Sequence, residues 1–96
     1  MNLKVALQAV IDEINRSEKK FPGFPTDPIH AAAIVNEESG ELCRAALMLT
    51  YEHPDVWGSV CHEAVHTAAM AIRFLMMMER MRRRPSKQVK KKEGFK

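Results

Sequence analysis

The chain has 96 residues, which suits one small domain whose hydrophobic core is modest when it folds alone. Its net charge of +3 is unevenly distributed, because residues 80–96 hold nine basic residues and one acid while residues 1–79 hold six basic residues and eleven acids. The acidic body argues against a nucleic-acid-binding fold, which would need basic residues on its own surface. Few residues are aromatic, and Met and Ala supply much of the apolar content, so the composition favours helices over sheet.

The spacing of the apolar residues predicts an all-α fold with three helices. We expect the first helix over about residues 2–20. Its apolar stripe consists of Leu3, Ala6, Leu7, Val10, Ile11 and Ile14. The segment 21–25 ends this helix, because it contains prolines and a glycine, which cannot continue a helix.

The second helix is predicted to begin after Asp27, which is suited to cap the helix N-terminus, with Pro28 at the first helical position. It should end near Tyr51, because residues 52–55 form the next break. A third helix is then expected from about residue 54 or 56 to about Arg84.

The third helix is apolar almost all round, and only His62, His66 and Arg73 fill a narrow polar sector. Two other helices in so small a chain cannot cover it on every side. The sequence therefore predicts a homodimer or homotetramer, in which a symmetry-related chain completes a four-helix-type bundle core.

We expect residues 1–84 to form the helical domain and residues 85–96 to be a basic, disordered tail, because the tail has no apolar periodicity. Its charge would allow weak, salt-sensitive contact with polyanions. No secretory signal or bilayer-spanning apolar stretch is apparent, so we expect a cytoplasmic protein without a membrane partner. Cys43 and Cys61 are expected to be buried, reduced thiols that serve packing.

Three glutamates fall on faces that the apolar pattern predicts to be buried. Glu38 lies inside the apolar stripe of the second helix and Glu41 on its edge, while Glu63 lies on the buried face of the third helix. Buried carboxylates are costly unless they are paired or hold a metal. Their coincidence with the apolar stripes therefore indicates a cation site rather than a solvated surface.

The spacing of these residues suits one shared ion. Glu38 and Glu41 are an i, i+3 pair on one helical face, and Glu63 and His66 repeat that spacing on the next helix. Antiparallel packing would bring the two pairs together, and carboxylates of this kind suit Mg2+ or Mn2+ completed by water and substrate phosphates. Glu37 lies one position off the stripe, where it is either an outer ligand, a partner of the ligands, or a solvated side chain.

The run from Ile34 to Leu42, which reads IVNEESGEL, is followed by Glu63-Ala64-Val65-His66. Together they resemble the MazG-like all-α nucleoside triphosphate pyrophosphohydrolases, whose pattern is Glu-Glu-x-x-Glu on one helix and Glu-x-x-Asp on the next. The resemblance extends over about residues 1–80 and includes the first helix and the break at 21–25. It implies the fold that the apolar pattern predicts.

The resemblance also implies that Glu38, Glu41 and Glu63 hold Mg2+ and act in catalysis, with Glu37 assisting. A metal-activated water would attack the α-phosphorus of a nucleoside triphosphate and release the monophosphate and pyrophosphate. The basic residues of the body that are placed to meet phosphate oxygens are Lys19, Lys20 and Arg73. A surface role is the alternative for the two lysines.

His66 departs from the family pattern, which has Asp at this position. Imidazole is a poor ligand for Mg2+ but a good one for Mn2+, Zn2+ or Ni2+. His66 would therefore bind a softer metal, contact phosphate when protonated, or mark a catalytically impaired domain used for nucleotide or protein binding. A histidine at the rim of the core, hydrogen-bonded to a neighbour, is the remaining alternative.

A second motif overlaps the first. His62-Glu63-Ala64-Val65-His66 matches the H-E-x-x-H pattern of zinc proteases, in which two histidines one helical turn apart bind Zn2+. The chain is very small for a protease, and this interpretation leaves Glu38 and Glu41 unexplained. A zinc site at His62 and His66 is therefore the third alternative.

Overall fold

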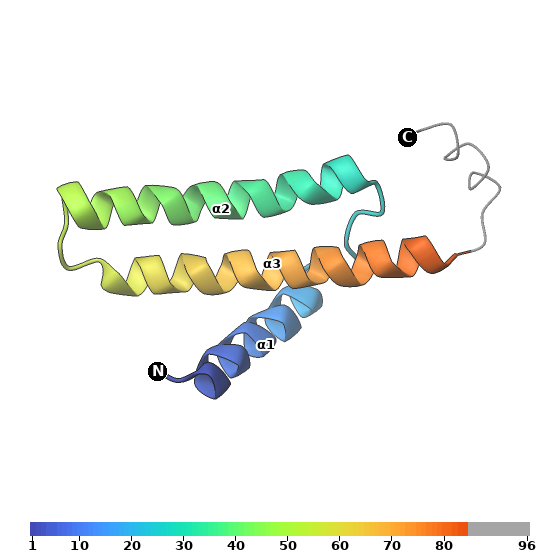
Figure 1. Cartoon of the computed structure of the whole chain (residues 1–96), viewed down its shortest axis with the longest axis horizontal. Helices are drawn as coiled ribbons and strands as arrows, with labels where there is room; N and C mark the ends of the chain where they lie inside the picture. The colour runs from blue at the N-terminus through green and yellow to red at the C-terminus, as the bar shows by residue number, and fades with distance from the viewer. Residues whose placement is uncertain (85–96) are drawn as a thin grey trace.

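A computed structural model describes residues 1–84 and confirms the predicted all-α fold. Three helices follow one another along the chain: α1 (Leu3–Lys20), α2 (Pro28–Tyr51) and α3 (Trp57–Arg83) (Figure 1). No strand occurs within residues 1–84. The predicted basic tail, residues 85–96, lies outside the described residues.

Local side chains cap the N-terminal ends of the first two helices. Asn2 Oδ1 accepts a hydrogen bond from the Val5 amide at 3.0 Å and so caps α1. Asp27 accepts one from the His30 amide at 2.8 Å, with Pro28 at the first position of α2, as predicted. α3 begins at Trp57 without a side-chain cap, and the Val56 amide before it donates to the His53 carbonyl at 3.2 Å in the preceding turn.

Figure 1 shows α2 and α3 running side by side in opposite directions, while α1 crosses α3 at a steep angle. Within the described part of the chain, α3 contacts both other helices, whereas α1 and α2 do not contact each other. The third helix is therefore the centre of the fold. Any site that uses residues of all three helices must form around α3.

The core of the single chain is small. The buried apolar residues are Ala31, Ala45 and Ala69, and no large side chain among the described residues is fully buried. On α3, Leu75 remains 63% exposed. The described helices thus leave much of α3 uncovered, which agrees with the expectation that two helices cannot cover it.

The inner face of α1 coincides with the predicted stripe only in part, since Ala6, Val10 and Ile14 are half-buried. Leu3, Leu7 and Ile11 are exposed, whereas Glu13 is half-buried and Ser17 is buried. The physical reason is that α3 offers polar partners to both residues: His66 lies beside Glu13, and Arg73 beside Ser17. These contacts set the rotation of α1 about its axis and leave half of its apolar stripe outside.

The two cysteines also differ from expectation. Cys43 and Cys61 are exposed in the single chain, so the prediction of buried thiols was wrong for this structure. Both lie on faces of α2 and α3 that neither neighbouring helix covers.

Among residues 1–84, no helix combines the length and apolarity that crossing a membrane requires.

Candidate metal centre

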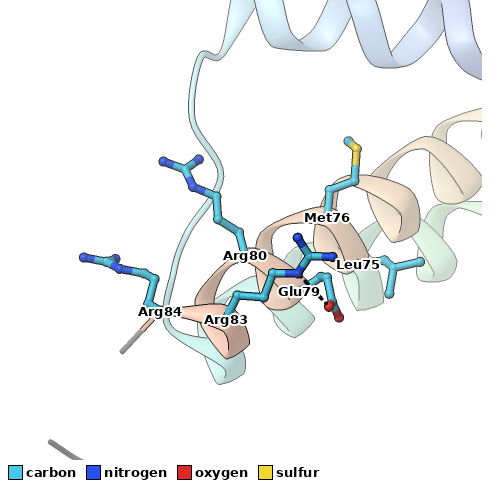
Figure 2. Close-up of a pocket in the computed structure, with 6 residues that line it drawn as sticks. All are labelled: Leu75, Met76, Glu79, Arg80, Arg83 and Arg84. Atoms are coloured by element: carbon cyan, nitrogen blue, oxygen red, sulfur yellow. Dashed lines mark hydrogen bonds and ion pairs between the residues drawn. The ribbon is translucent and has the colours of Figure 1, made fainter. Parts of the chain in front are cut away.

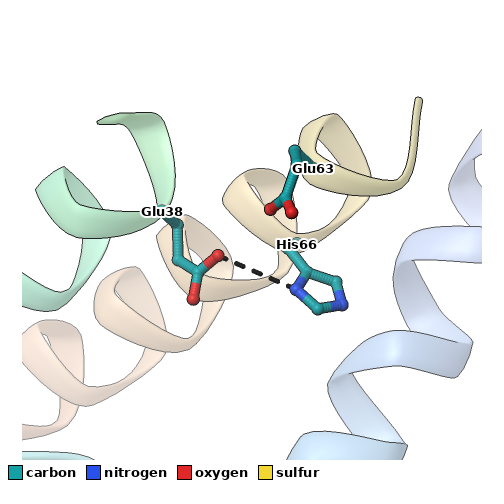
Figure 3. Close-up of side chains that lie close together, drawn as sticks. All are labelled: Glu38, Glu63 and His66. Atoms are coloured by element: carbon teal, nitrogen blue, oxygen red, sulfur yellow. Dashed lines mark ion pairs between the residues drawn. The ribbon is translucent and has the colours of Figure 1, made fainter. Parts of the chain in front are cut away.

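Three of the predicted ligands meet across the contact between α2 and α3. Glu38 on α2 faces Glu63 and His66 on α3, and one ligand atom from each lies within 4.8 Å of the others (Figure 3). All three side chains are half-buried. The antiparallel packing of the two helices produces this meeting, although the repeated i, i+3 spacing predicted that Glu41 would join it as well.

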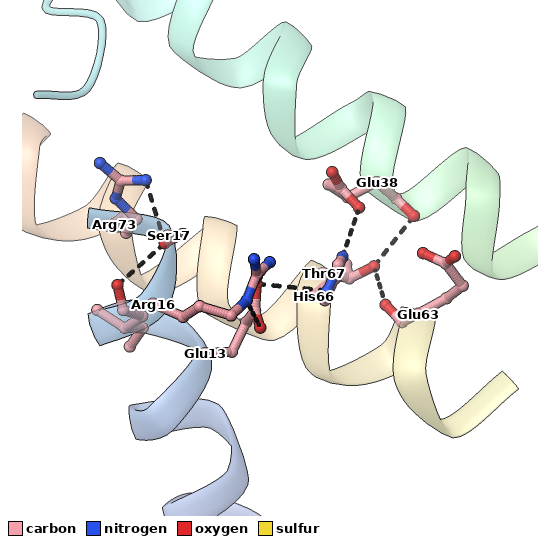
Figure 4. Close-up of polar contacts among 9 residues, drawn as sticks. Glu13, Arg16, Ser17, Glu38, Glu63, His66, Thr67 and Arg73 are labelled. Atoms are coloured by element: carbon pink, nitrogen blue, oxygen red, sulfur yellow. Dashed lines mark hydrogen bonds and ion pairs between the residues drawn. The ribbon is translucent and has the colours of Figure 1, made fainter. Parts of the chain in front are cut away.

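Thr67 fixes the two helices at the level of this cluster. Its hydroxyl oxygen lies 3.1 Å from the Glu38 carbonyl on α2 and 2.8 Å from the Glu63 carbonyl on its own helix (Figure 4). A hydroxyl has one proton, so it donates to one carbonyl at a time. When it donates to Glu38, the more distant of the two, it holds the backbone of that ligand against α3.

The His66 ring lies between carboxylates of two different helices. Its Nδ1 is 3.7 Å from Glu38 Oε1, and its Nε2 is 3.3 Å from Glu13 Oε2 on α1 (Figure 4). Nε2 is buried and has no aligned hydrogen-bond partner within residues 1–84. The nearest acceptor for it is therefore Glu13.

Glu13 is a site residue that the sequence did not predict. Its side chain is only 11% exposed, and Arg16 donates to both of its carboxylate oxygens, at 2.9 and 2.6 Å. This hydrogen bonding holds the pKa of the Glu13 carboxyl below its usual range, helped by the nearby His66 and opposed by desolvation. The signal in the sequence that could have found Glu13 is its helical position. It lies three residues after Val10, and so on the same side of the helix as part of the apolar stripe.

Two predicted residues lie outside the cluster. The Glu41 side chain is 51% exposed, and its nearest cation is Arg44 on the same helix, at 3.9 Å. Glu37 is exposed as well. In the single chain the cluster thus contains two carboxylates and an imidazole, and the metal-binding roles of Glu41 and Glu37 stay predictions.

The predicted phosphate-binding residues have different surroundings. Lys19 and Lys20 are exposed at the end of α1. Arg73 is only 5% exposed, and its guanidinium donates to Ser17 Oγ (3.2 Å) and to the carbonyls of Phe21 (2.9 Å) and Gly23 (3.2 Å). A phosphate would have to compete with these bonds, so Arg73 serves in the single chain to fasten the α1–α2 connection to α3.

A divalent cation limits both the distances between its ligands and their chemistry. Ligand atoms on one Mg2+ ion are about 3 Å apart when adjacent and about 4.2 Å apart when opposite, so three atoms that lie within 4.8 Å of one another must draw closer together to share the ion. Carboxylates suit Mg2+ and Mn2+, whereas the imidazole favours Mn2+ or softer ions. The residues therefore fit a divalent cation, with Mn2+ matching the mixed set better than Mg2+.

The H-E-x-x-H motif of zinc proteases lies on α3, but only one of its two histidines belongs to the cluster. The rings of His62 and His66 pack with their centroids 4.2 Å apart, tilted by 48°. His66 belongs to the cluster with Glu38 and Glu63, whereas His62 is exposed and outside it. In a protease site Glu63 would act as base rather than share a cluster with one histidine.

A separate open hollow of about 760 Å3 lies at the end of α3. It is lined by Leu75, Met76, Glu79, Arg80, Arg83 and Arg84. Figure 2 shows the Arg80 and Arg84 side chains extending away from the helix and Arg83 turned toward Glu79. Glu79 is thirteen positions from His66 along α3, or about 20 Å at helical rise, so this hollow is not part of the cluster.

No family model, curated protein or solved structure matches the chain. Its resemblance to the MazG-like enzymes therefore stays a prediction from the sequence. The geometry of the cluster is independent of that resemblance.

Proposed function

We propose that the chain is a metal-dependent nucleoside triphosphate pyrophosphohydrolase, which converts a (deoxy)nucleoside triphosphate to the monophosphate and pyrophosphate. The observation that carries the proposal is the meeting of Glu38, Glu63 and His66 across the α2–α3 contact. Residues from both halves of the motif come together there, although they lie on different helices.

Within this proposal, Glu38 and Glu63 hold Mg2+ or Mn2+, and His66 is the third ligand from the chain. The bound cation would neutralise the triphosphate, lower the pKa of a water molecule and orient its attack on the α-phosphorus. Thr67 keeps Glu38 in register with α3 through its backbone. Lys19 and Lys20, exposed at the end of α1, would meet the outer phosphates.

We further propose that the chain acts as a homodimer or homotetramer. Leu3 and Leu7 on α1 are 73% and 49% exposed, and Leu75 on α3 is 63% exposed. A second copy that covers these side chains would supply the apolar burial that the small core of one chain lacks. This assembly would be the four-helix-type bundle predicted from the sequence.

The outward position of Glu41 favours one alternative function. With Glu41 exposed beside Arg44, a single chain offers one carboxylate fewer than the resemblance implies. A domain with this incomplete set would bind a nucleotide or a protein partner without hydrolysing it. A zinc site that uses His62 and His66 is the third possibility.

The test is pyrophosphate release from a panel of ribo- and deoxynucleoside triphosphates, with Mg2+ and then with Mn2+. We expect metal-dependent release by the full chain, and a loss of more than about 100-fold in Glu38→Gln, since removing a ligand should exceed the effect of residues behind the ligands. Glu52→Gln is the matched control, because Glu52 is an exposed glutamate directly after the last residue of α2 and away from the cluster. Helical circular dichroism verifies that each variant is folded.

Absence of release with every nucleotide and both metals would overturn the hydrolase. Nucleotide binding that persists in its place would favour the binding domain. One tightly bound Zn2+ per chain, lost in His62→Ala, would instead favour the zinc site.

A further inference from the structure

We propose that Glu13 is a positioning residue for the metal centre: it orients His66 so that Nδ1 of the imidazole points at the cation. This inference rests on the proposed metal centre and extends it from two helices to all three. It is carried by the contact of His66 with carboxylates on both sides of its ring.

The two ring nitrogens of His66 face different helices. Nδ1 faces Glu38 at 3.7 Å and is the nitrogen that can join the cluster, whereas Nε2 points to α1. A neutral imidazole that ligates a cation through Nδ1 carries its proton on Nε2. That proton needs an acceptor, because Nε2 is buried and lacks an aligned partner within residues 1–84.

Glu13 supplies the carboxylate that lies beside Nε2. The distance of 3.3 Å would shorten by about 0.4 Å in an ordinary hydrogen bond, which a small rotation of the carboxylate achieves. Arg16 holds that carboxylate with two donors, so its orientation is already restricted. A chain of contacts thus leads from Arg16 through Glu13 to His66.

The consequence is that cation binding and the docking of α1 are coupled. Histidine ligands in metal sites usually donate their second N–H to a carboxylate, which fixes the tautomer and raises the basicity of the ligand. Here the carboxylate comes from a helix that contributes nothing else to the cluster. Binding of the cation would therefore strengthen the attachment of α1 to α3, and the reverse must also hold.

The experiment is a titration of the full chain with Mn2+ alone, followed by calorimetry and by the loss of the free Mn2+ signal in electron paramagnetic resonance. We expect Glu13→Ala to weaken Mn2+ binding by about 10- to 100-fold, the usual effect of residues behind a metal ligand. Glu13→Gln should lose less, because its amide oxygen still accepts from Nε2. Asp12→Asn is the matched control, since Asp12 is the adjacent exposed carboxylate on α1.

A double-mutant cycle separates positioning from a merely structural role. In a His66→Asp background the ligand no longer has a second nitrogen, so Glu13→Gln should have no further effect on Mn2+ affinity. An equal loss in both backgrounds would overturn the inference, as would an unchanged affinity in Glu13→Ala. If Glu38→Gln also leaves Mn2+ binding unchanged, the metal centre itself is wrong and the proposed function fails with it.

Discussion

The two helix contacts of α3 are built from different chemistry. Polar pairs join α1 to α3: Glu13 lies beside His66, and Ser17 accepts a hydrogen bond from the buried Arg73. Between α2 and α3 the single side-chain hydrogen bond within residues 1–84 is that from Thr67 to the Glu38 carbonyl. The Glu38–His66 pair, with Oε1 and Nδ1 3.7 Å apart, adds a polar contact at the same level, whereas small side chains line the groove of Ala32, Val35, Asn36, Ser39, Ala71 and Phe74.

This difference explains how α3 both holds α2 close and fixes the orientation of α1. Apolar contacts are not directional, so they hold α2 close to α3 without fixing every side chain. Hydrogen bonds and ion pairs are directional, so they determine which face of α1 turns inward. The polar contact thus specifies orientation at the expense of apolar burial, and it leaves Leu3 and Leu7 outside.

The largest expected effect comes from breaking the polar contact at Arg73. Arg73→Ala would remove three hydrogen bonds and leave the carbonyls of Phe21 and Gly23 without this donor. Hydrogen bonds to charged groups are worth about 1.5–3 kcal/mol each, so we expect the free energy of unfolding to fall by about 3 kcal/mol or more. Urea unfolding followed by circular dichroism measures it.

The controls for this variant use the same residue type. Arg73→Lys should recover only part of the loss, because an ammonium group cannot reproduce the planar fork of donors. Arg44→Ala should change stability by less than about 1 kcal/mol, since its side chain is 71% exposed. Equal unfolding midpoints for Arg73→Ala and Arg44→Ala would show that the buried guanidinium does not fasten α1.

A somewhat smaller loss of stability is expected from a larger side chain on the face of α3 that packs against α1. Ala69 is fully buried and lies three residues after His66 and four before Arg73, so it shares their face of α3. Ala69→Leu should cost about 1–3 kcal/mol, because extra methylenes would force α1 away from its polar partners. The comparison variant is Ala33→Leu on the exposed face of α2, and a similar stability of the two variants would contradict close packing at Ala69.

The fold could be predicted from the sequence as far as local signals reach. Asp27 and Pro28 mark the start of α2, and the break at 21–25 ends α1, because these residues act on their immediate neighbours. The face of α1 was not predictable in the same way. It depends on His66 and Arg73, which lie about fifty residues away and whose position beside α1 only the tertiary contact creates.

The candidate site shows the same limit. Glu38, Glu63 and His66 could be grouped because equal spacing on two antiparallel helices brings them together. Glu13 carries no spacing that connects it to them. The outward position of Glu41 was also not apparent, because a residue on the edge of a stripe faces either the partner helix or solvent, depending on a small rotation of the helix.

The α2–α3 contact can be tested at its side-chain hydrogen bond. Thr67→Val keeps the shape of the side chain and removes the hydroxyl that reaches the Glu38 carbonyl. We expect a loss of about 1 kcal/mol, since the carbonyl keeps its place in the α2 helix and only one neutral hydrogen bond is lost. Thr50→Val, whose hydroxyl bonds only within α2, is the control, and the cross-helix bond has no special value if both variants lose the same stability.

The smallest effect is expected outside both contacts, at the end of α3. Arg82 and Arg83 donate to the Glu79 carboxylate and hold its pKa below the ordinary value of 4.5. Because the pKa is lowered in the folded chain, this stabilisation is present above pH 4.5 and is lost as the pH falls through the lowered pKa. Glu79→Gln should therefore be slightly less stable than the natural chain near neutral pH and equal to it in strong acid.

Urea midpoints measured across this pH range, with and without added salt, test that expectation. Since the Glu79 side chain is 37% exposed, salt should remove most of the small difference by screening the charges. A difference that grows as the pH falls would have the wrong sign for a lowered pKa. If Glu79→Gln lost as much stability as Arg73→Ala, surface ion pairs along α3 would matter as much as its buried contact with α1. The stability of the helix that carries the candidate metal centre would then not depend mainly on that contact.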